Sequence, residues 1–361
     1  MNYIQKMEQA ANQAIADRVF PGCVVGVVNK DGDRLVLPIG NLTYESESPP
    51  VKTDTVYDVA SVTKSIPTGC LALQLVDEGA LNLTDKLSDY VPEFKNSDRD
   101  KVLIKHLLTY TLDGYSFVTT ARATKKLNIE ELTADDLLDT LFTYDFTARP
   151  GTTFKYTNIP ATLLGLVIER VTDQKLDQLA EDRFFKPLQM ERSTFAPQKF
   201  DSDEVAPTEY DKWRGLVHRV VHDESAYIFK EAGMVMGHAG LFSTAPDILQ
   251  FLEMLLHDGK HKGKKYFSAE ILQQMSENQI PTLGETTGLG WELFQPRYMG
   301  QYCGPQTFGK TGFTGTVCVC DRSKGLAYVI LSNRTFPERS ADSSGINTFR
   351  AQIGDIILGL A

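Results

Sequence analysis

At the start of the chain the pattern of hydrophobic and polar positions changes once, from helical spacing to strand-like runs. This change predicts a helix followed by two antiparallel strands. Residues 3–19 carry apolar side chains at helical spacing, and the tripeptide Phe20-Pro21-Gly22 ends this pattern. Residues 23–28 form a β-branched, apolar run that is typical of a buried strand. The turn sequence at residues 31–33 then leads into a return strand over residues 34–39.

A helical stripe begins near Ser61, and helical patterns continue through the middle of the chain. Leu71, Leu75 and Leu81 lie on this stripe. Pro67 favours a helix that starts close to Ser61, because proline is tolerated only in the first turn of a helix. Further helices are predicted over residues 134–142, 161–171 and 246–256.

The C-terminal part returns to strand patterns and completes the predicted fold. Residues 315–320 and 326–331 are β-branched or apolar runs separated by a turn, and residues 347–360 predict a closing helix. We predict an α/β (α+β) fold, with an antiparallel sheet that is built from both chain ends and flanked by helices. Its domains would be a discontinuous sheet domain (1–70 and 275–361) and an inserted, mainly helical domain (71–274), with the active site in the cleft between them.

Composition and charge narrow the possible partners. The chain has 361 residues, of which 42% are hydrophobic and 23% are charged, so it can bury the core of one large or two modest domains. Its net charge of -10 disfavours nucleic acid and anionic membranes as partners. The sequence contains no apolar run of about 18 residues, so we expect no membrane span.

The N-terminal sequence and the cysteine spacing indicate the cellular compartment that we expect. The first fifteen residues lack the continuous apolar stretch of a signal peptide. We therefore expect the chain as given to be cytoplasmic, or periplasmic or secreted if it is a mature form from which a leader was removed. Five cysteines at irregular spacing suit a reducing compartment and predict buried free thiols.

Three short motifs, each present once, supply candidate catalytic chemistry: Ser61-Val62-Thr63-Lys64, Tyr156-Thr157-Asn158 and Lys310-Thr311-Gly312. A serine nucleophile needs a base, and Lys64 can reach Ser61 because positions i and i+3 share one face of a helix. The ordinary lysine pKa of about 10.4 must then be lowered, by burial or by a neighbouring cation such as Lys310. Tyr156, as a phenolate between two ammonium groups, is the competing base, and the sequence leaves the choice open.

Residues near the second and third motifs complete the predicted site. In an extended segment Tyr156 and Asn158 point to the same side, so the Asn158 amide would hold Lys64 and a substrate carbonyl. Residues 310–313 are expected to form an edge strand, in which Gly312 lets a substrate backbone approach closely. The N–H groups of Phe313 and Ser61 would form an oxyanion hole. Each motif alone is common by chance, so it is their order and context that favour an acyl-transferring active site.

With these motifs the chain resembles the serine β-lactamase and penicillin-binding-protein superfamily. The resemblance is greatest to its class C-like branch, which also contains D-stereospecific peptidases and family VIII-type carboxylesterases. It covers nearly the whole chain and implies a β-lactamase/transpeptidase-like fold. Besides the three motifs, it rests on His106-Leu107-Leu108-Thr109, on Arg149-Pro150-Gly151 ahead of Tyr156, on Gly240-Leu241-Phe242-Ser243-Thr244 and on Gly309 to Gly315.

The resemblance implies a role for each motif residue. Ser61 is the acylated nucleophile, Lys64 and Tyr156 are proton-transfer partners, and Asn158 orients the substrate. Lys310 and Thr311 contact a substrate carboxylate or stabilise the tyrosine. Lys310 stands where many relatives have histidine, and its permanent charge favours a substrate with a carboxylate.

The resemblance also bears on two further positions. Tyr-x-Asn replaces Ser-Asp-Asn of class A relatives, so no separate glutamate base for deacylation is expected. His238 lies in a glycine-rich segment that borders the cleft in the family, which makes it a candidate substrate-binding residue. A loop histidine bound to the backbone is the alternative.

We therefore expect a serine hydrolase that forms an acyl-enzyme on an amide, β-lactam or ester, without metal or cofactor. Its partner would be a small-molecule or short-peptide substrate, and the sequence does not predict the oligomeric state. A carboxylesterase of the same fold and a non-catalytic binding homologue are the alternatives. Gly304 to Thr311 also matches the phosphate-loop pattern, but a strand rather than a helix is predicted to follow it, which disfavours a nucleotide site.

Overall fold

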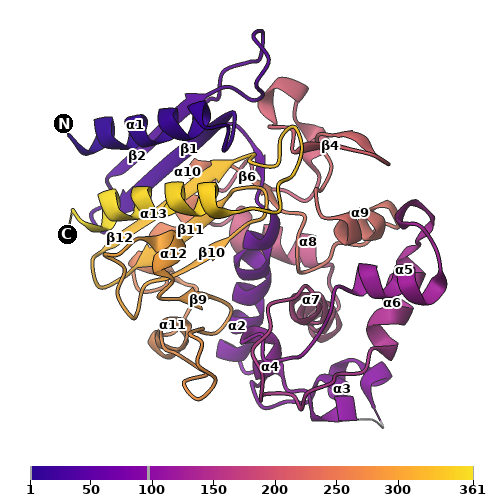
Figure 1. Ribbon diagram of the computed structural model, residues 1–361. Coiled ribbons are helices and arrows are strands. Elements are labelled where there is room, and N and C mark those ends of the chain that lie inside the picture. The colour runs from indigo at the N-terminus through magenta and orange to yellow at the C-terminus, as the bar shows by residue number, and fades with distance from the viewer. Residues whose placement is uncertain (1, 96–97, 361) are drawn as a thin grey trace.

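The computed structural model describes residues 2–95 and 98–360 and is built around one antiparallel sheet. The strand order is β2-β1-β12-β11-β10-β9, so strands from the two ends of the chain lie side by side (Figure 1). This confirms the predicted fold class. The six strands are β1 (Gly22–Asn29), β2 (Arg34–Gly40), β9 (Glu292–Leu293), β10 (Phe308–Thr311), β11 (Val317–Asp321) and β12 (Leu326–Ser332).

The pairing of β1 with β12 joins the chain ends and sets two apolar faces. Val25 lies opposite Ile330, and Val24 lies opposite Leu331. Successive side chains in a strand point to opposite faces. Val25 and Ile330 accordingly belong to one buried cluster, and Val24 and Leu331 belong to another. Both faces therefore need a covering layer.

Two terminal helices cover one face of the sheet. They are α1 (Tyr3–Ala16) and α13 (Ser344–Leu358), which contact each other and lie along the same side in Figure 1. Asn2 caps α1, since its side chain accepts a hydrogen bond from the Gln5 N–H at 2.9 Å. The short helix α12 (Pro296–Met299) packs against α13 on this face.

The opposite face is covered by α10 (Ala245–Leu256), which packs against β1, β12 and β11. The apolar face formed by residues such as Val24 needs this cover, and Leu249 and Leu252 of α10 are fully buried in the same cluster. The predicted division into two domains, which assigns residues 245–256 to the inserted helical domain, stays a prediction.

The middle of the chain is mainly helical, as its periodicity indicated. Its short strands are β3 (Tyr57–Asp58) with β6 (Phe242–Ser243), β4 (Glu209–Asp211) with β5 (Gly215–Val217), and β7 (Lys260–His261) with β8 (Lys264–Lys265). Its α-helices are α2 (Cys70–Asp77), α3 (Leu87–Tyr90), α4 (Ile104–Leu108), α5 (Phe117–Lys125), α6 (Ala134–Thr143), α7 (Ile159–Thr172), α8 (Leu176–Ala180), α9 (Glu224–Glu231) and α11 (Ala269–Ser276). Of these, α3, α5, α6, α7 and α9 lie away from the large sheet in Figure 1.

The helix expected to start near Ser61 is divided into three segments. Ser61 lies in a 3-10 helix, η1 (Ala60–Lys64), which is followed by η2 (Ser65–Gly69) and then by α2. Ile66 leaves helical geometry, with φ -115° and ψ 111°. The residue before a proline is pushed out of the helical region, and Pro67 follows Ile66. Lys64 still follows Ser61 by one turn.

Two expectations from composition can be compared with the structure. In the part of the chain that the structure describes, no helix has the length and apolarity needed to cross a membrane. All five cysteines are free and buried, as their spacing predicted.

Candidate active site

Ser61 and Lys64 are in direct contact at the N-terminal turn of η1. Lys64 Nζ donates hydrogen bonds to Ser61 Oγ at 2.8 Å and to the carbonyl oxygen of His238 at 2.8 Å. Lys64 is only 1% exposed. Burial lowers the pKa of Lys64 below its ordinary value, because the charged ammonium loses its water shell. A neutral amine beside Ser61 Oγ can accept the serine proton.

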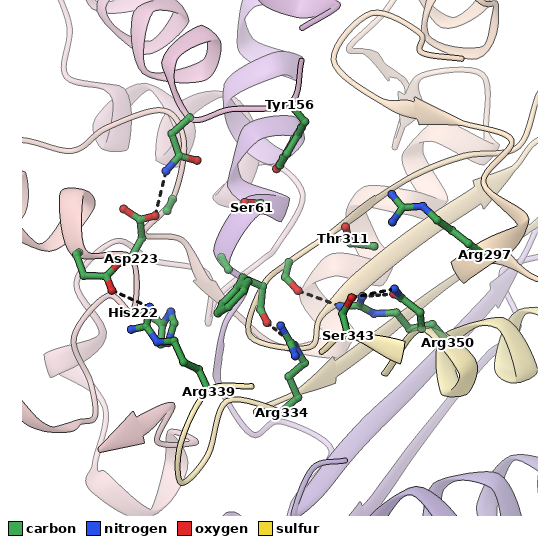
Figure 2. Close-up of a pocket in the computed structure, with 17 residues that line it drawn as sticks. Ser61, Tyr156, His222, Asp223, Arg297, Thr311, Arg334, Arg339, Ser343 and Arg350 are labelled. Atoms are coloured by element: carbon green, nitrogen blue, oxygen red, sulfur yellow. Dashed lines mark hydrogen bonds and ion pairs between the residues drawn. The ribbon is translucent and has the colours of Figure 1, made fainter. Parts of the chain in front are cut away.

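Tyr156 lies close to Ser61, and its hydroxyl points toward the serine (Figure 2). Burial raises the pKa of Tyr156, but the ammonium groups of Lys310 and Lys64 outweigh it and bring the pKa below its ordinary value. Their Nζ atoms lie 4.2 Å and 5.5 Å from the centre of the tyrosine ring. Tyr110 packs on this ring at 5.2 Å between centroids.

Lys310 is buried beneath Tyr156 and forms an ion pair with Glu292, a residue that was not predicted from the sequence. The Tyr298 hydroxyl donates to the same carboxylate at 2.8 Å. Burial lowers the pKa of Lys310, but Glu292 and Tyr156 outweigh this effect and raise it. Because Lys310 does not line the cavity beside the serine, the geometry favours stabilisation of Tyr156 over contact with a substrate carboxylate.

This cavity has a volume of about 390 Å³. It brings together the predicted residues Ser61, Tyr156, Asn158, Thr311, Gly312 and Phe313. The other three predicted site residues, Lys64, Lys310 and His238, are buried behind the cavity wall.

Asn158 is the N-cap residue of α7, and its side chain has a partner that the sequence did not indicate. Its Nδ2 donates to Asp223 Oδ2 at 3.1 Å, rather than accepting from Lys64 as predicted. Asp223 caps α9, where its Oδ1 accepts from the Ala226 N–H at 3.0 Å. Asn158 therefore lies on the cavity wall with its amide nitrogen tied to a helix cap, while the contact to substrate stays a prediction.

The His238 side chain is placed differently from the prediction. It is fully buried, with Nδ1 2.8 Å from Thr162 Oγ1 and Nε2 2.9 Å from Ser225 Oγ. The backbone oxygen of His238 faces Lys64 instead. The preceding residue, Gly237, lets this segment pack tightly on α7, because a Cβ there would lie 2.3 Å from the Ala161 carbonyl oxygen. His238 contributes a carbonyl that holds Lys64, and its ring has no contact with the cavity.

Within the described part of the chain, the two N–H groups of the predicted oxyanion hole are free to bind, and the hole itself stays a prediction. Across residues 2–95 and 98–360, neither the Ser61 N–H nor the Phe313 N–H has a hydrogen-bond acceptor from the protein. Both residues line the cavity, and Phe313 is 45% exposed. Gly312 lines the cavity, and its backbone packs closely on the protein, because a Cβ there would lie 2.4 Å from the Val59 carbonyl oxygen. The close approach of a substrate backbone to Gly312 stays a prediction.

The predicted edge strand also needs a correction. β10 is the second strand from the edge, since β9 pairs with it. However, β9 covers only Phe308 and Gly309, because it is two residues long. The β10 edge at Thr311 is therefore left open beside the cavity. The phosphate-loop alternative fails here, because Lys310 lies inside a strand that continues into a hairpin.

Four arginines line the cavity, and none of them was predicted from the sequence. They come from three separate parts of the chain and have no common motif: Arg297, Arg334, Arg339 and Arg350. Arg334 donates to the carbonyl oxygen of Phe313 at 2.8 Å and to two other carbonyls of its own loop. Among the described residues no carboxylate lies within ion-pair distance of Arg334, although Asp342 attracts it at longer range.

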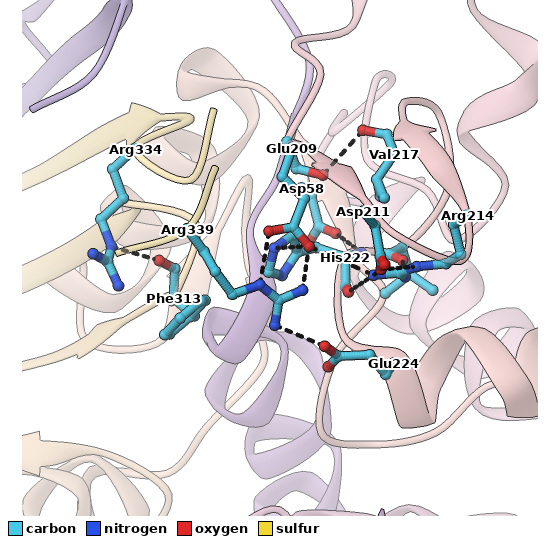
Figure 3. Close-up of polar contacts among 12 residues, drawn as sticks. Asp58, Glu209, Asp211, Arg214, Val217, His222, Glu224, Phe313, Arg334 and Arg339 are labelled. Atoms are coloured by element: carbon cyan, nitrogen blue, oxygen red, sulfur yellow. Dashed lines mark hydrogen bonds and ion pairs between the residues drawn. The ribbon is translucent and has the colours of Figure 1, made fainter. Parts of the chain in front are cut away.

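Arg339 lines the cavity and is paired with carboxylates (Figure 3). Its Nε donates to Glu209 at 2.7 Å and its Nη1 donates to Glu224 at 2.7 Å. Burial raises the pKa of Glu209, but hydrogen bonds from Arg339 and His222 outweigh it and lower the pKa to about 2. This buried network links the loop that carries Arg334 to the β4–β5 hairpin.

The fold and the Ser61–Lys64–Tyr156 arrangement define a serine hydrolase site. Comparison with known proteins agrees: the family described as Beta-lactamase matches residues 6–352. A protein of Escherichia coli (strain K12) with the description "Putative D-alanyl-D-alanine carboxypeptidase" is 32% identical over 312 residues, which cover 79% of this chain and 71% of that protein. The chain belongs to the β-lactamase family and is a serine hydrolase of that family.

Solved structures share the fold. One is described as "EstCE1, a hydrolase with promiscuous acyltransferase activity", with a TM-score of 0.79 and 20% identity, covering 99% of this chain and 98% of that chain. Another is a class C β-lactamase, with a TM-score of 0.73 and 20% identity, covering 97% of both chains. At this identity the likeness concerns the fold alone.

Proposed function

We propose that this hydrolase cleaves an amide next to a free carboxylate, as in a peptide that ends in D-alanine or in a β-lactam. The observation that carries this proposal is the charge of the cavity. Four arginines and two carboxylates, Asp223 and Glu224, line it in a chain whose net charge is -10. A positive cavity in an acidic protein attracts an anionic substrate and repels a cationic one.

Arg334 is the best-placed group to bind the substrate carboxylate. Arg339 is already paired with two glutamates, and Arg350 is 4% exposed and donates to the carbonyls of Gly312 and Thr316. Arg334 lines the cavity and keeps its charge without a close carboxylate partner among the described residues. A guanidinium binds a carboxylate through two parallel hydrogen bonds, and the Thr311 hydroxyl on the open edge of β10 offers a third.

The proposed reaction begins at the Ser61–Lys64 contact. Lys64 takes the proton of Ser61 as the oxygen attacks the substrate carbonyl, because Lys64 Nζ is 2.8 Å from Ser61 Oγ and its pKa is lowered. The negative oxygen that forms is stabilised by the N–H groups of Ser61 and Phe313. Tyr156 gives a proton to the leaving nitrogen, and water later hydrolyses the acyl-enzyme.

Intact-mass measurement with benzylpenicillin tests the proposal, alongside release of D-alanine from N-acetyl-L-Lys-D-Ala-D-Ala. We expect an adduct, or turnover of the penicillin, together with D-alanine release, and we expect Ser61→Ala to abolish all of them. The Ser61→Ala variant should melt at nearly the wild-type temperature, which controls for folding. Hydrolysis of p-nitrophenyl butyrate without penicillin or peptide turnover would favour the carboxylesterase alternative. A wild-type protein that reacts with none of these compounds would favour a binding homologue.

A further inference from the structure

One buried acidic residue lies directly before the nucleophile segment and is not explained by the proposed reaction. Asp58, in β3, is 1% exposed and does not line the cavity. Its Oδ1 accepts from the Ala60 N–H at 2.8 Å and its Oδ2 accepts from the His222 N–H at 2.7 Å. Figure 3 shows Asp58 beside His222 within this polar network.

The first of these bonds fixes the backbone just before Ser61. Ala60 has φ +48°, a left-handed conformation that an alanine adopts only when its surroundings impose it. An aspartate that accepts from the N–H two residues further on stabilises such a turn. The bond from Ala60 to Asp58 therefore orients the next peptide, which carries the Ser61 N–H.

The loop that carries Phe313 rests on the same short segment. Thr314 Oγ1 donates to the Asp58 carbonyl at 2.7 Å, and Thr316 Oγ1 donates to the Val59 carbonyl at 3.0 Å. The Gly312 N–H closes this turn on the Thr316 carbonyl at 2.8 Å. The Phe313 peptide is thereby attached to the chain that leads into Ser61.

His222 adds a third connection between Asp58 and the loop. Its N–H binds Asp58, and its ring packs on Phe313 with 5.7 Å between centroids and an interplanar angle of 30°. Asp58 thus contacts groups that hold both the Ser61 peptide and the Phe313 side chain. No other acidic residue among those described bonds to both sides of the predicted hole.

We propose that Asp58 is a positioning residue that sets the spacing and direction of the two oxyanion-hole N–H groups. The inference rests on the proposed function, since it requires a tetrahedral intermediate at Ser61. Asp58 does not touch the substrate. The two N–H groups meet full negative charge only in the transition state, so a change at Asp58 affects kcat more than KM.

Asp58→Asn is the direct test. The asparagine amide has nearly the shape of the carboxylate, but only one of its two polar atoms is an acceptor oxygen. Either the Ala60 N–H or the His222 N–H would therefore face the amide NH₂, which is a donor. Removing an oxyanion donor costs about 10²–10³ in rate, so misplacing one should lower kcat by about 10- to 100-fold. With p-nitrophenyl acetate as substrate, KM should stay within about threefold of wild type, because ground-state binding does not use these N–H groups.

A second measurement separates positioning from general damage. Phenylboronic acid forms a tetrahedral adduct on a catalytic serine and places an oxygen in the oxyanion hole. Its inhibition constant should rise in Asp58→Asn by the factor by which kcat/KM falls. Thr314→Val, which removes the hydroxyl bonded to the Asp58 carbonyl, should show the same proportionality with a smaller loss, and Thr314→Ser should restore activity.

Asp247→Asn is the matched control. Asp247 is also a buried carboxylate, 6% exposed, and accepts from the Arg192 N–H at 2.8 Å and from Ser193 Oγ at 2.9 Å, but it does not line the cavity. Its variant should lose stability and keep its kcat.

The outcomes separate this inference from the proposed function. An active wild type whose folded Asp58→Asn and Thr314→Val variants keep kcat and the inhibition constant would overturn the role of Asp58 alone. A wild type that neither hydrolyses the ester nor binds phenylboronic acid would overturn the proposed function, and this inference with it.

Discussion

Two buried lysines lie on either side of Tyr156, and one difference between their surroundings decides what each can do. Lys64 is bonded to a hydroxyl and a main-chain carbonyl, whereas Lys310 forms an ion pair with Glu292. Burial lowers the pKa of Lys64 below its ordinary value. Burial acts on Lys310 in the same direction, but the Glu292 carboxylate outweighs it and raises the pKa.

Burial alone therefore does not decide the role of a lysine in this site. The lysine with neutral contacts can give up its proton and serve as a base, and the lysine with a carboxylate contact remains a cation. That permanent cation lies 4.2 Å from the Tyr156 ring and helps to lower the pKa of the phenol. Lys64 and Lys310 therefore differ in chemistry because they differ in their partners.

The largest expected effect is at Lys64. Lys64→Ala removes the group in contact with Ser61 Oγ, so kcat should fall by on the order of 10³-fold, within the range of general acid–base catalysis. Lys64→Arg keeps the charge but cannot release its proton, and it should be equally impaired. Steady-state hydrolysis of p-nitrophenyl acetate measures both. An arginine variant near wild-type activity would show that Lys64 is not the base.

The next largest effect concerns stability. Glu292→Gln leaves the Lys310 ammonium buried without its carboxylate, which should lower the free energy of unfolding by about 3–5 kcal/mol. Urea unfolding followed by circular dichroism measures this change. In the double variant Glu292→Gln with Lys310→Met, the lysine that would lack a carboxylate partner is also gone. The double variant should therefore regain part of the lost free energy of unfolding. If Glu292→Gln were as stable as the wild type, the ion pair with Glu292 could not be what distinguishes Lys310 from Lys64.

A smaller effect is expected at Arg334, the residue that we propose binds the substrate carboxylate. A hydrogen bond to a charged group contributes about 1.5–3 kcal/mol, so Arg334→Gln should raise KM for N-acetyl-L-Lys-D-Ala-D-Ala by roughly 10- to 100-fold. KM for p-nitrophenyl acetate, which has no carboxylate, should not change. Arg297→Gln is the control, because Arg297 is 63% exposed and already lies 4.0 Å from Glu292. Equal effects on both substrates would argue against carboxylate binding by Arg334.

The smallest effect is a shift in pH dependence. Only neutral Lys64 accepts a proton, so kcat/KM should rise with pH through the Lys64 pKa, below the ordinary value of 10.5. Lys310→Met removes a neighbouring positive charge that lowers the Lys64 pKa, so the rising limb should move to higher pH. A pH–rate profile with the uncharged ester measures the shift. A limb that stays in place would show that burial alone sets the Lys64 pKa.

The sequence by itself determined the local elements and the reactive groups. The β1–β2 hairpin was predicted over residues 23–28 and 34–39 and extends over Gly22–Asn29 and Arg34–Gly40. The contact of Ser61 with Lys64 was likewise expected, since the residues are one turn apart. Such features depend on residues a few positions away, so periodicity, turn residues and motif spacing are sufficient to predict them.

Only the tertiary structure decided which groups face one another. Lys310 meets Glu292 across 18 positions of sequence, and Thr316 meets Val59 across 257. The burial of the His238 ring and the position of Arg334 on the cavity wall are of the same kind. These contacts follow from the pairing of strands from opposite chain ends and from the need to cover the apolar faces of the sheet. A local sequence pattern predicts neither the strand pairing nor the element that covers each face.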